Sequence, residues 1–489
     1  MRLPIDQRRL LPGLLTLCLL LLAGCGAVRP GLQPEALSLT VLYTNDEHGW
    51  MEGMTPQQGA AHLYGLWVQQ EGFVPDGPFL VLSGGDNWTG PAVSTTVAGQ
   101  SMVDVMNRMH YAASAVGNHE FDFGLEVLSQ RIREADYPYL SANTRWHSTG
   151  AVPTDLGIQP YTVVEVNSLR VGIIGLTTTS TPQTTNPANV AALQFTDYAQ
   201  ALRLTVPAVR AEGVDLLFVI AHVCLEPLRQ LAPLVADLDI QLMGGGHCNE
   251  LAAERIDDMV LLGGGYHFTS YARAQFSYQP RQRESAIVDF SVRDNQAAMP
   301  DARIQAAVQG WQQQVDASLA TVIGFNAREL ARRDPVLEQA VIDSWLLADS
   351  TADVAITNPG GIRAPLPAGE ITIGSIVGIM PFDNTIVAIN LSGAELRQAL
   401  SNGTRPLVAG LVSVEGQWFE SDGGAVLADD KAYRVLVNSF MYAGGDNYQG
   451  LATADPEGFD TGINYRQPFL DWISAQQTSA EQPLQLGNR

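Results

Sequence analysis

Short motifs of Asp, His and Asn are spread over the first half of this 489-residue chain, and each ends an apolar run or lies beside Gly. Their potential metal ligands are Asp46, His48, Asp86, Asn118, His222, His247 and Asn249. Carboxylate, imidazole and amide oxygen donors together suit borderline divalent cations such as zinc or manganese. Seven ligand groups exceed the four of one tetrahedral ion. The set therefore predicts two ions that share one carboxylate, although each motif alone also fits a capped turn or a structural histidine.

The stretch Gly117–Asp122 (GNHEFD) adds groups that could take part in a reaction. It places an acid or charge stabiliser, His119, directly after the ligand candidate Asn118, and a carboxylate, Asp122, three residues later. The preceding apolar run, residues 112–116, predicts the end of a buried strand.

The elements that must position these motifs form an alternating pattern. Apolar runs predict strands over residues 37–44, 79–82, 112–116, 169–176, 214–221 and 240–243. Helical patterns lie between several of them, as in residues 125–135 and 198–212. Strands that alternate with helices indicate a layered α/β domain. Every motif comes just past the carboxyl end of a strand, where ligand sites of α/β sheets gather.

A second region follows residues 300–321, which predict one helix of about six turns that joins two domains. This region has a helical pattern over 337–347 and strands over 354–357 and 433–437. Its chemistry-bearing segments are the Gly-rich turn 358–363 (NPGGIR) and residues 438–448, which include NSF and GGDNY. The tail from residue 476 is polar.

The N-terminus has the features of a targeting segment. A basic start precedes a mostly apolar run, residues 10–22, and then Ala23-Gly24-Cys25. This resembles the lipobox of bacterial lipoproteins, in which the cysteine carries the lipid; the alternative is an ordinary signal peptide. We therefore expect an extracytoplasmic protein anchored to a membrane through Cys25. Gly26 after the cysteine resembles the pattern of lipoproteins sorted to the outer membrane, so its periplasmic face or the cell surface is expected.

The formal net charge of −23 limits the choice of partner. Such a surface repels polyanions, so we expect no nucleic acid partner. A small anionic substrate would then need a local positive site made of metal ions or arginines. Two cysteines, Cys224 and Cys248, lie within two residues of ligand candidates. They pair as a disulfide or remain free in an oxidising compartment, and zinc ligation by either is the less favoured alternative.

These motifs together resemble those of the calcineurin-like metallophosphoesterases, and specifically the two-domain 5′-nucleotidase family. The resemblance covers nearly all of residues 36–475 and rests on TNDEHG, GGDN, GNHEFD, AH and GGHCN, then NPGGIR, ITIGSIVGIMPFDN, NSF and GGDNY. It implies an N-terminal four-layer α/β/β/α metallophosphoesterase domain, a linking helix and a C-terminal α+β domain that binds the substrate. The implied boundaries are 1–24 for the signal peptide, 25–36 for a tether, 37–298, 299–323 and 324–475 for these three parts, and 476–489 for the tail.

Carried over by position, the resemblance implies that one ion binds Asp46, His48 and Asn249. The other would bind Asn118, His222 and His247, with Asp86 bridging both. His119 and Asp122 match the family's catalytic dyad, in which the carboxylate orients the imidazole and favours its charged form. The alternative for Asp122 is a helix N-terminal carboxylate stabilised by the helix dipole.

The resemblance also implies substrate contacts in the C-terminal domain. Arg363 matches a substrate-binding arginine, Phe440 a base-stacking aromatic and Asp446 a ribose-binding acid; core packing and a plain turn are the alternatives for the last two. Asn402 and Arg405 are weaker candidates, because the segment that carries a second stacking aromatic in relatives is short here and has none. Glu338-Gln339 replaces a Gly-Asn pair of the family.

The function implied is that of a 5′-nucleotidase, an enzyme that uses two metal ions to release nucleoside and phosphate from extracytoplasmic nucleotides. Two metals about 3.5–4 Å apart can activate a water and clamp the phosphate. Alternative substrates are 2′,3′-cyclic nucleotides with 3′-nucleotides, UDP-sugars or a non-nucleotide ester. Thiosulfohydrolase activity and a nucleotide-binding lipoprotein without catalysis are less favoured. Base preference and oligomeric state stay open.

Overall fold

A computed structural model describes residues 36–486, apart from residues 56, 297, 383, 403–404 and 422–423. The predicted signal peptide, Cys25 and nearly all of the tether lie outside the described residues. Within them, no helix combines the length and the apolar character needed to cross a membrane.

The N-terminal domain is built on two six-stranded sheets. The first has the order β14 (Glu284–Asp294), β13 (Ser270–Gln279), β1 (Leu37–Thr44), β2 (Phe79–Ser83), β3 (Tyr111–Ala115), β4 (Tyr139–Leu140). The second has the order β11 (Leu251–Ile256), β12 (Met259–Gly264), β10 (Leu242–Gly245), β9 (Leu216–His222), β7 (Leu169–Thr177), β6 (Tyr161–Val166). The strands β1 to β4 run parallel, as do β12, β10, β9 and β7, so their carboxyl ends share one edge of each sheet.

The two sheets pack face to face, and helices cover their outer faces. Alternate residues of β1 show why: Leu39 and Val41 enter the core between the sheets, whereas Leu42 enters the core under the helices. Strands buried on both faces explain the continuous apolar runs of the sequence. The helices on the first sheet include α1 (Ala60–Leu66), α3 (Gln100–Arg108) and α4 (Gly124–Glu134). Those on the second are α7 (Tyr198–Ala211) and α8 (Leu225–Leu234), and the expected α/β/β/α arrangement is confirmed.

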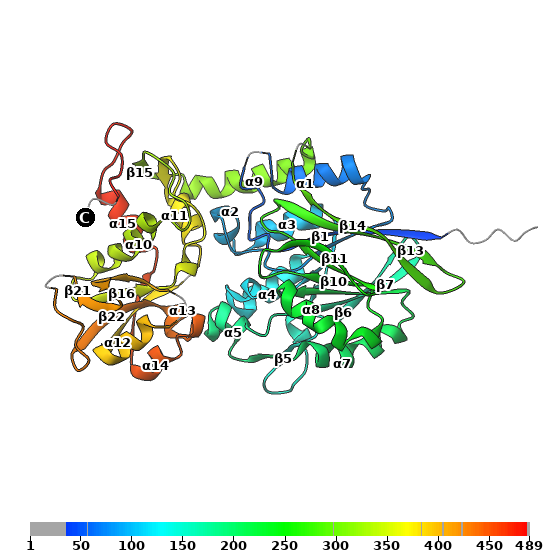
Figure 1. Cartoon of the computed structure of the whole chain (residues 1–489). Helices are drawn as coiled ribbons and strands as arrows, with labels where there is room; N and C mark the ends of the chain where they lie inside the picture. The colour runs from blue at the N-terminus through cyan, green and yellow to red at the C-terminus, as the bar shows by residue number, and fades with distance from the viewer. Residues whose placement is uncertain are drawn as a thin grey trace, which may run out of the picture.

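A long helix, α9 (Ala302–Leu319), leads to the C-terminal domain (Figure 1). The side chain of Asp301 caps its start by accepting hydrogen bonds from the N–H groups of Arg303 and Ile304. The C-terminal domain has a five-stranded sheet with the order β19 (Leu407–Ala409), β16 (Val354–Thr357), β22 (Ala432–Asn438), β18 (Thr385–Ser392), β23 (Phe459–Asn464). The helices α10 (Pro335–Ala348) and α15 (Gln467–Ala475) share one core with this sheet. The helix α12 (Gly393–Leu400) belongs to a second core with it.

The two domains meet at the carboxyl edge of the N-terminal strands. There α5 (Thr181–Thr184) contacts η6 (Gly445–Asn447) of the C-terminal domain, and α2 (Ala92–Thr95) contacts α11 (Ile373–Ile379). Figure 1 shows α5 beside α13 (Ser439–Tyr442) at this boundary. The motifs of both halves of the sequence therefore face one another.

Candidate active site

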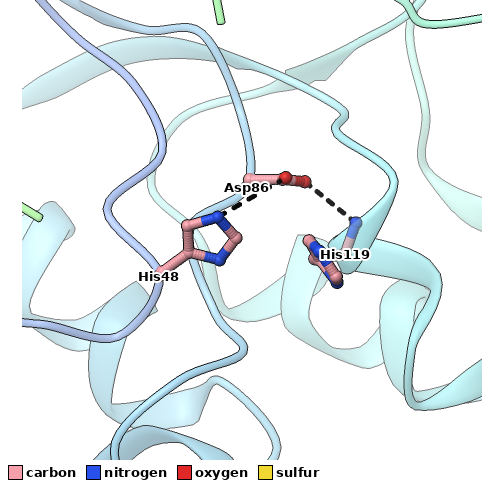
Figure 2. A group of neighbouring side chains, drawn as sticks. All are labelled: His48, Asp86 and His119. Atoms are coloured by element: carbon pink, nitrogen blue, oxygen red, sulfur yellow. Dashed lines mark hydrogen bonds and ion pairs between the residues drawn. The ribbon is translucent and has the colours of Figure 1, made fainter. Parts of the chain in front are cut away.

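Asp86 lies at the centre of the potential metal ligands. It follows β2, and its Oδ2 atom lies 3.0 Å from Nε2 of His222 and 3.7 Å from Nε2 of His48. Figure 2 shows Asp86 between His48 and His119, whose backbone N–H donates to the other carboxylate oxygen at 2.9 Å. A carboxylate in this place, between two imidazoles, is the group that two divalent cations would share.

The other ligand candidates lie on either side of Asp86. Oδ1 of Asp46 lies 3.9 Å from Nε2 of His48 and accepts a hydrogen bond from the backbone N–H of His247, 201 positions further along the chain. Nε2 of His222 lies 3.1 Å from Oδ1 of Asn118 and 3.2 Å from Nδ1 of His247. Segments far apart in the sequence thus bring these donors together.

Asn249 is the remaining candidate of the seven, and it lies two residues after His247. It lines the same cavity as His48, Asp86 and His247. The structure therefore places all seven predicted ligands at one site.

Hydrogen bonds outside this group direct the donor atoms toward it. Nδ1 of His222 lies 2.9 Å from the Gly84 carbonyl, and Nδ1 of His48 lies 3.1 Å from the Thr89 carbonyl. Because a carbonyl can only accept, each Nδ1 carries a proton and each Nε2 faces the site. The amide nitrogen of Asn118 donates to the Thr184 carbonyl at 3.1 Å, which turns its oxygen inward. Imidazoles, carboxylates and an amide oxygen in this orientation fit two divalent cations.

Strained backbone marks the same residues. Asp46, His48, Asp86, His247 and Asn249 all have positive φ angles, between 46° and 72°. A non-glycine residue in this region costs about 1–3 kcal/mol and persists only where the surroundings impose it. Five of the seven ligand candidates thus adopt a backbone conformation that lowers the stability of the fold, which is typical of functional sites.

Two buried carboxylates, Glu47 and Glu120, form hydrogen bonds to the loops that carry the ligand candidates. Glu120 accepts hydrogen bonds from the N–H groups of Asp86, Asn87 and Gly117 at 2.7–2.9 Å. Glu47 accepts from the side chains of Thr44, Ser83 and Asn87. Both residues belong to motifs read from the sequence, TNDEHG and GNHEFD, but neither is among the seven ligand candidates. Their role here is to join the loops that follow β1, β2 and β3.

The protonation of the site depends on burial and charge together. Burial lowers the pKa of His222, but Asp86 outweighs it and raises the pKa to about 9. Burial lowers the pKa of His247 to about 4, and the neighbouring His222 adds to that effect. Without metal, the raised pKa favours the charged form of His222 beside Asp86, and a divalent cation would displace that proton.

His119 and Asp122 form the predicted pair. Nδ1 of His119 lies 2.7 Å from Oδ2 of Asp122, and Phe382 of the C-terminal domain stacks on the imidazole with ring centroids 5.5 Å apart. Burial lowers the pKa of His119, but Asp122 and Asp86 outweigh it and the pKa is raised. The second oxygen of Asp122 accepts from the Thr185 hydroxyl at 2.8 Å. Both carboxylate oxygens therefore serve side chains of the site, which favours the dyad over a helix N-terminal role.

A cavity of about 620 Å³ extends from these residues into the C-terminal domain. Arg363, Phe440 and Asp446, for which the sequence predicts substrate contacts, line this cavity. One guanidinium nitrogen of Arg363 lies 3.4 Å from Nε2 of His48, and the guanidinium lies over Phe382. The cationic end of Arg363 thus reaches the metal ligands from the other domain.

Arg332 also lines the cavity, although sequence analysis did not identify it. Its Nε donates to the Ile362 carbonyl at 2.9 Å, and burial together with the nearby Arg363 lowers its pKa to about 10. The sequence signal was weak, because Arg332 lies in an arginine pair outside any recognised motif. Two arginines, Arg332 and Arg363, therefore line this cavity.

At the far end of the cavity, Asp446 is held by a neighbouring amide. Nδ2 of Asn358 donates to Oδ2 of Asp446 at 2.8 Å, and Asn438 donates to Oδ1 of Asn358 at 2.9 Å. Burial raises the pKa of Asp446, and the hydrogen bond from Asn358 opposes this. The Phe440 ring packs against Gly445, where any side chain would overlap it. An aromatic face and a carboxylate are thus presented to the same space.

Asn402 and Arg405 do not line the cavity, in contrast to their predicted substrate roles. The Asn402 amide donates to the backbone carbonyls of Asp446 and Asn447, so it supports the loop that carries Asp446. Arg405 donates to Glu338 at 2.9 Å, a carboxylate that is only 4% exposed. Glu338 and Arg405 both lie where the sequence departs from the family pattern. Their ion pair holds the shortened segment around Arg405 against α10.

Cys224 and Cys248 form a disulfide, with Cα atoms 5.2 Å apart. The bond joins the segment that follows β9, whose last residue is His222, to the loop after β10, which carries His247 and Asn249. The alternatives of free thiols and of zinc ligation by these cysteines are therefore corrected, since the sulfur atoms are joined to each other.

Comparisons with known proteins find relatives among 5′-nucleotidases. The family model described as "5′-nucleotidase, C-terminal domain" matches residues 314–453. The chain is 25% identical to a 5′-nucleotidase of Vibrio cholerae, over 93% of this chain and 94% of that protein. It is also 25% identical to the snake venom 5′-nucleotidase of Naja atra, over 85% and 92% of the two chains.

Solved structures share the fold. The crystal structure of a 5′-nucleotidase precursor from Thermus thermophilus superposes with a TM-score of 0.79 at 25% identity, covering 92% of this chain and 98% of that one. The structure of a sulfate thiohydrolase, SoxB, from the same organism superposes with a TM-score of 0.71 at 16% identity and covers 90% and 94%. At that identity the second likeness concerns the fold alone.

Proposed function

Because the chain belongs to the 5′-nucleotidase family of hydrolases, we propose that it is a dinuclear metal-dependent phosphohydrolase that releases phosphate from nucleotides. The observation that carries this proposal is the continuity of the cavity. It runs from Asp86 and the ligand candidates around it, past His119 and Arg363, to Phe440 and Asp446. A phosphate at one end and a nucleoside at the other match the chemistry of this lining.

When bound, two divalent cations supply Lewis acidity and lower the pKa of water toward about 7. The arginines Arg332 and Arg363 oppose the charge of the phosphate in a protein whose formal net charge is −23. His119, held by Asp122, donates a hydrogen bond to the phosphoryl group or to the departing 5′ oxygen. Burial lowers the pKa of His119, but Asp122 and Asp86 raise it more, which favours the charged imidazole.

The C-terminal residues fix the rest of the substrate. The Phe440 ring stacks on the nucleobase, and Asp446 accepts hydrogen bonds from ribose hydroxyls. Phe382 covers His119 from the C-terminal domain and keeps bulk water from that face of the imidazole. The two domains thus complete one site that neither contains alone.

A second candidate substrate class is favoured by the wall around Phe440. Besides Phe440, the aromatic residues that line the described cavity are Phe123 and Phe382; Phe382 stacks on His119, and Phe123 directly follows Asp122. If the base stacks on Phe440 alone, the open side of the base leaves room for cyclic nucleotides, nucleotide sugars or other esters. These are alternative substrates for the same phosphoryl chemistry.

The test is hydrolysis by the chain from residue 27 onward, after chelation and reloading with zinc, manganese or cobalt. Phosphate is measured for the monoesters and ATP, the nucleotide and nucleoside products for 2′,3′-cyclic AMP and UDP-glucose, and p-nitrophenol for the artificial diester. The substrates are 5′-AMP, 3′-AMP, 2′,3′-cyclic AMP, ATP, UDP-glucose and bis-p-nitrophenyl phosphate. Metal-dependent turnover fastest on 5′-AMP or ATP supports the proposal, and activity on the artificial diester alone contradicts the nucleotide assignment. His119→Ala should reduce turnover by about 100-fold or more while metal content stays at two ions per chain.

We also propose that a lipid on Cys25 anchors the protein outside the cytoplasm, on the basis of the Ala23-Gly24-Cys25 motif. Expression with labelled palmitate tests this. The label is expected on the full chain and absent from Cys25→Ser, and label on both or on neither contradicts the anchor.

A further inference from the structure

Asp122 of the dyad has two oxygen atoms, and each is held by a different side chain. Oδ2 lies 2.7 Å from Nδ1 of His119, and Oδ1 accepts a hydrogen bond from the Thr185 hydroxyl at 2.8 Å. Thr185 is 1% exposed, and 63 residues of sequence separate it from Asp122. A buried hydroxyl on a carboxylate that already serves a histidine limits rotation of that carboxylate.

The segment around Thr185 is tied to the dyad loop at further points. The Asn189 amide donates to the carbonyls of Phe121 and Asp122 at 3.0 and 2.9 Å. The Thr184 carbonyl accepts from the Asn118 amide at 3.1 Å. These contacts fix the segment that carries Thr185 relative to the loop that carries Asp122.

The same segment reaches the substrate side of the site. Its helix α5 contacts η6, which contains Asp446, and Thr184, Thr185 and Asn189 line the cavity together with Phe440. Thr185 therefore lies where the two domains and the dyad meet. A threonine that served only the hydrophobic core would not require its hydroxyl at this place.

We propose that Thr185 is a positioning residue for the dyad, so that His119, Asp122 and Thr185 act as one hydrogen-bonded unit. The inference rests on the proposed phosphohydrolase function. The hydroxyl fixes the plane of the Asp122 carboxylate, and the carboxylate in turn fixes the imidazole of His119 against the phosphoryl group. Removing the hydroxyl leaves the fold and the metal ligands in place but loosens the imidazole.

The test compares Thr185→Val, which removes the hydroxyl at nearly constant volume, with Thr185→Ser, which keeps it. We expect kcat of Thr185→Val to fall about tenfold with KM changed less than about twofold, and Thr185→Ser to recover most of the loss. The matched control is Thr181→Val. Thr181 lies in the same segment, is fully buried and donates only to the Thr178 carbonyl, so kcat should stay within about twofold.

A double-mutant cycle separates positioning from general destabilisation. If Thr185 acts through Asp122, Thr185→Val should add no further loss of kcat in an Asp122→Ala background. Additive losses, or a loss in Thr185→Ser equal to that in Thr185→Val, would overturn the proposal. Metal content is measured for every variant, and a fall in Thr185→Val below two ions per chain would also count against it.

A spectroscopic readout keeps this inference distinct from the proposed function. The Nδ1 proton of His119 gives a downfield proton resonance that is identified by its loss in His119→Ala. This resonance should shift or broaden in Thr185→Val and return in Thr185→Ser, whether or not the protein hydrolyses any ester of the panel. An unchanged resonance in Thr185→Val refutes the positioning role, whereas a chain that hydrolyses no phosphoester refutes the proposed function alone.

Discussion

The proposed nucleobase contact of Phe440 allows a quantitative test of the C-terminal half of the site. Phe440→Ala removes the ring that lines the nucleoside end of the cavity. Stacking of a base on an aromatic side chain is worth about 1–3 kcal/mol, a factor of roughly 5 to 150 in affinity. The ring packs against Gly445, and the other phenylalanines that line the described cavity, Phe123 and Phe382, lie beside Asp122 and His119. We therefore expect the low end of this range, about 1 kcal/mol.

The assay compares kcat/KM for AMP and for ribose 5-phosphate, which carries the same phosphate and sugar without the base. Phe440→Ala should lower the value for AMP about fivefold and leave that for ribose 5-phosphate within about twofold. The matched control is Phe459→Ala, because Phe459 lies on the edge strand β23, is 64% exposed and does not line the cavity. An equal fall on both substrates, or no fall on AMP, would refute base stacking by Phe440.

Three further predictions concern the pH dependence of stability, the contribution of Arg332 to turnover, and the effect of the disulfide on metal affinity. Burial lowers the pKa of His222, but the carboxylate of Asp86 has the larger effect and raises the pKa to about 9. The pKa of a histidine in an unfolded chain is about 6.5. This proton therefore stabilises the chelated protein below pH 6.5, and about 3 kcal/mol is lost as the pH rises through 9. Calorimetry should show the unfolding temperature falling over this range for the chelated sample only; a parallel fall in the metal-loaded sample would contradict the assignment. Replacing Arg332 with Met should lower kcat/KM for AMP about 30-fold, since a hydrogen bond to a charged group is worth about 2 kcal/mol, while the same change at the exposed Arg333 should have little effect. Reduction of the Cys224–Cys248 bond should weaken metal affinity about tenfold in competition with a chromophoric chelator, and the double Ser variant should behave the same with or without reductant; equal affinity before and after reduction would show that the bond does not hold the ligand loops.

The layered fold and its elements were largely accessible from the sequence. The alternation of apolar strands with helices is a local property, because residues buried on both faces of β9 or β7 must be apolar wherever the strand lies. Predicted and observed elements accordingly agree to within a few residues, as for the helix predicted over 300–321 and observed as α9. The identity of the metal ligand candidates was equally local, since each of them follows the end of a strand.

Contacts between distant segments could not be read in this way. Thr185 and Arg332 carry no motif, and they matter only because folding places one on Asp122 and the other at the end of the cavity. Arg405 shows the reverse case, since the sequence placed it near a substrate position and Glu338 binds it instead. Each of these outcomes depends on which side chains the two sheets and two domains bring within hydrogen-bonding distance.

The sequence by itself determined the chemical types of the donors, their order and the strands that end in them. Only the tertiary structure decided that Asp86 lies between His222 and His48, that Cys224 joins Cys248, and that Arg363 of the C-terminal domain reaches His48. The physical reason is range: hydrophobic periodicity acts over a few residues, whereas an active site is made by contacts between residues that lie far apart in the chain.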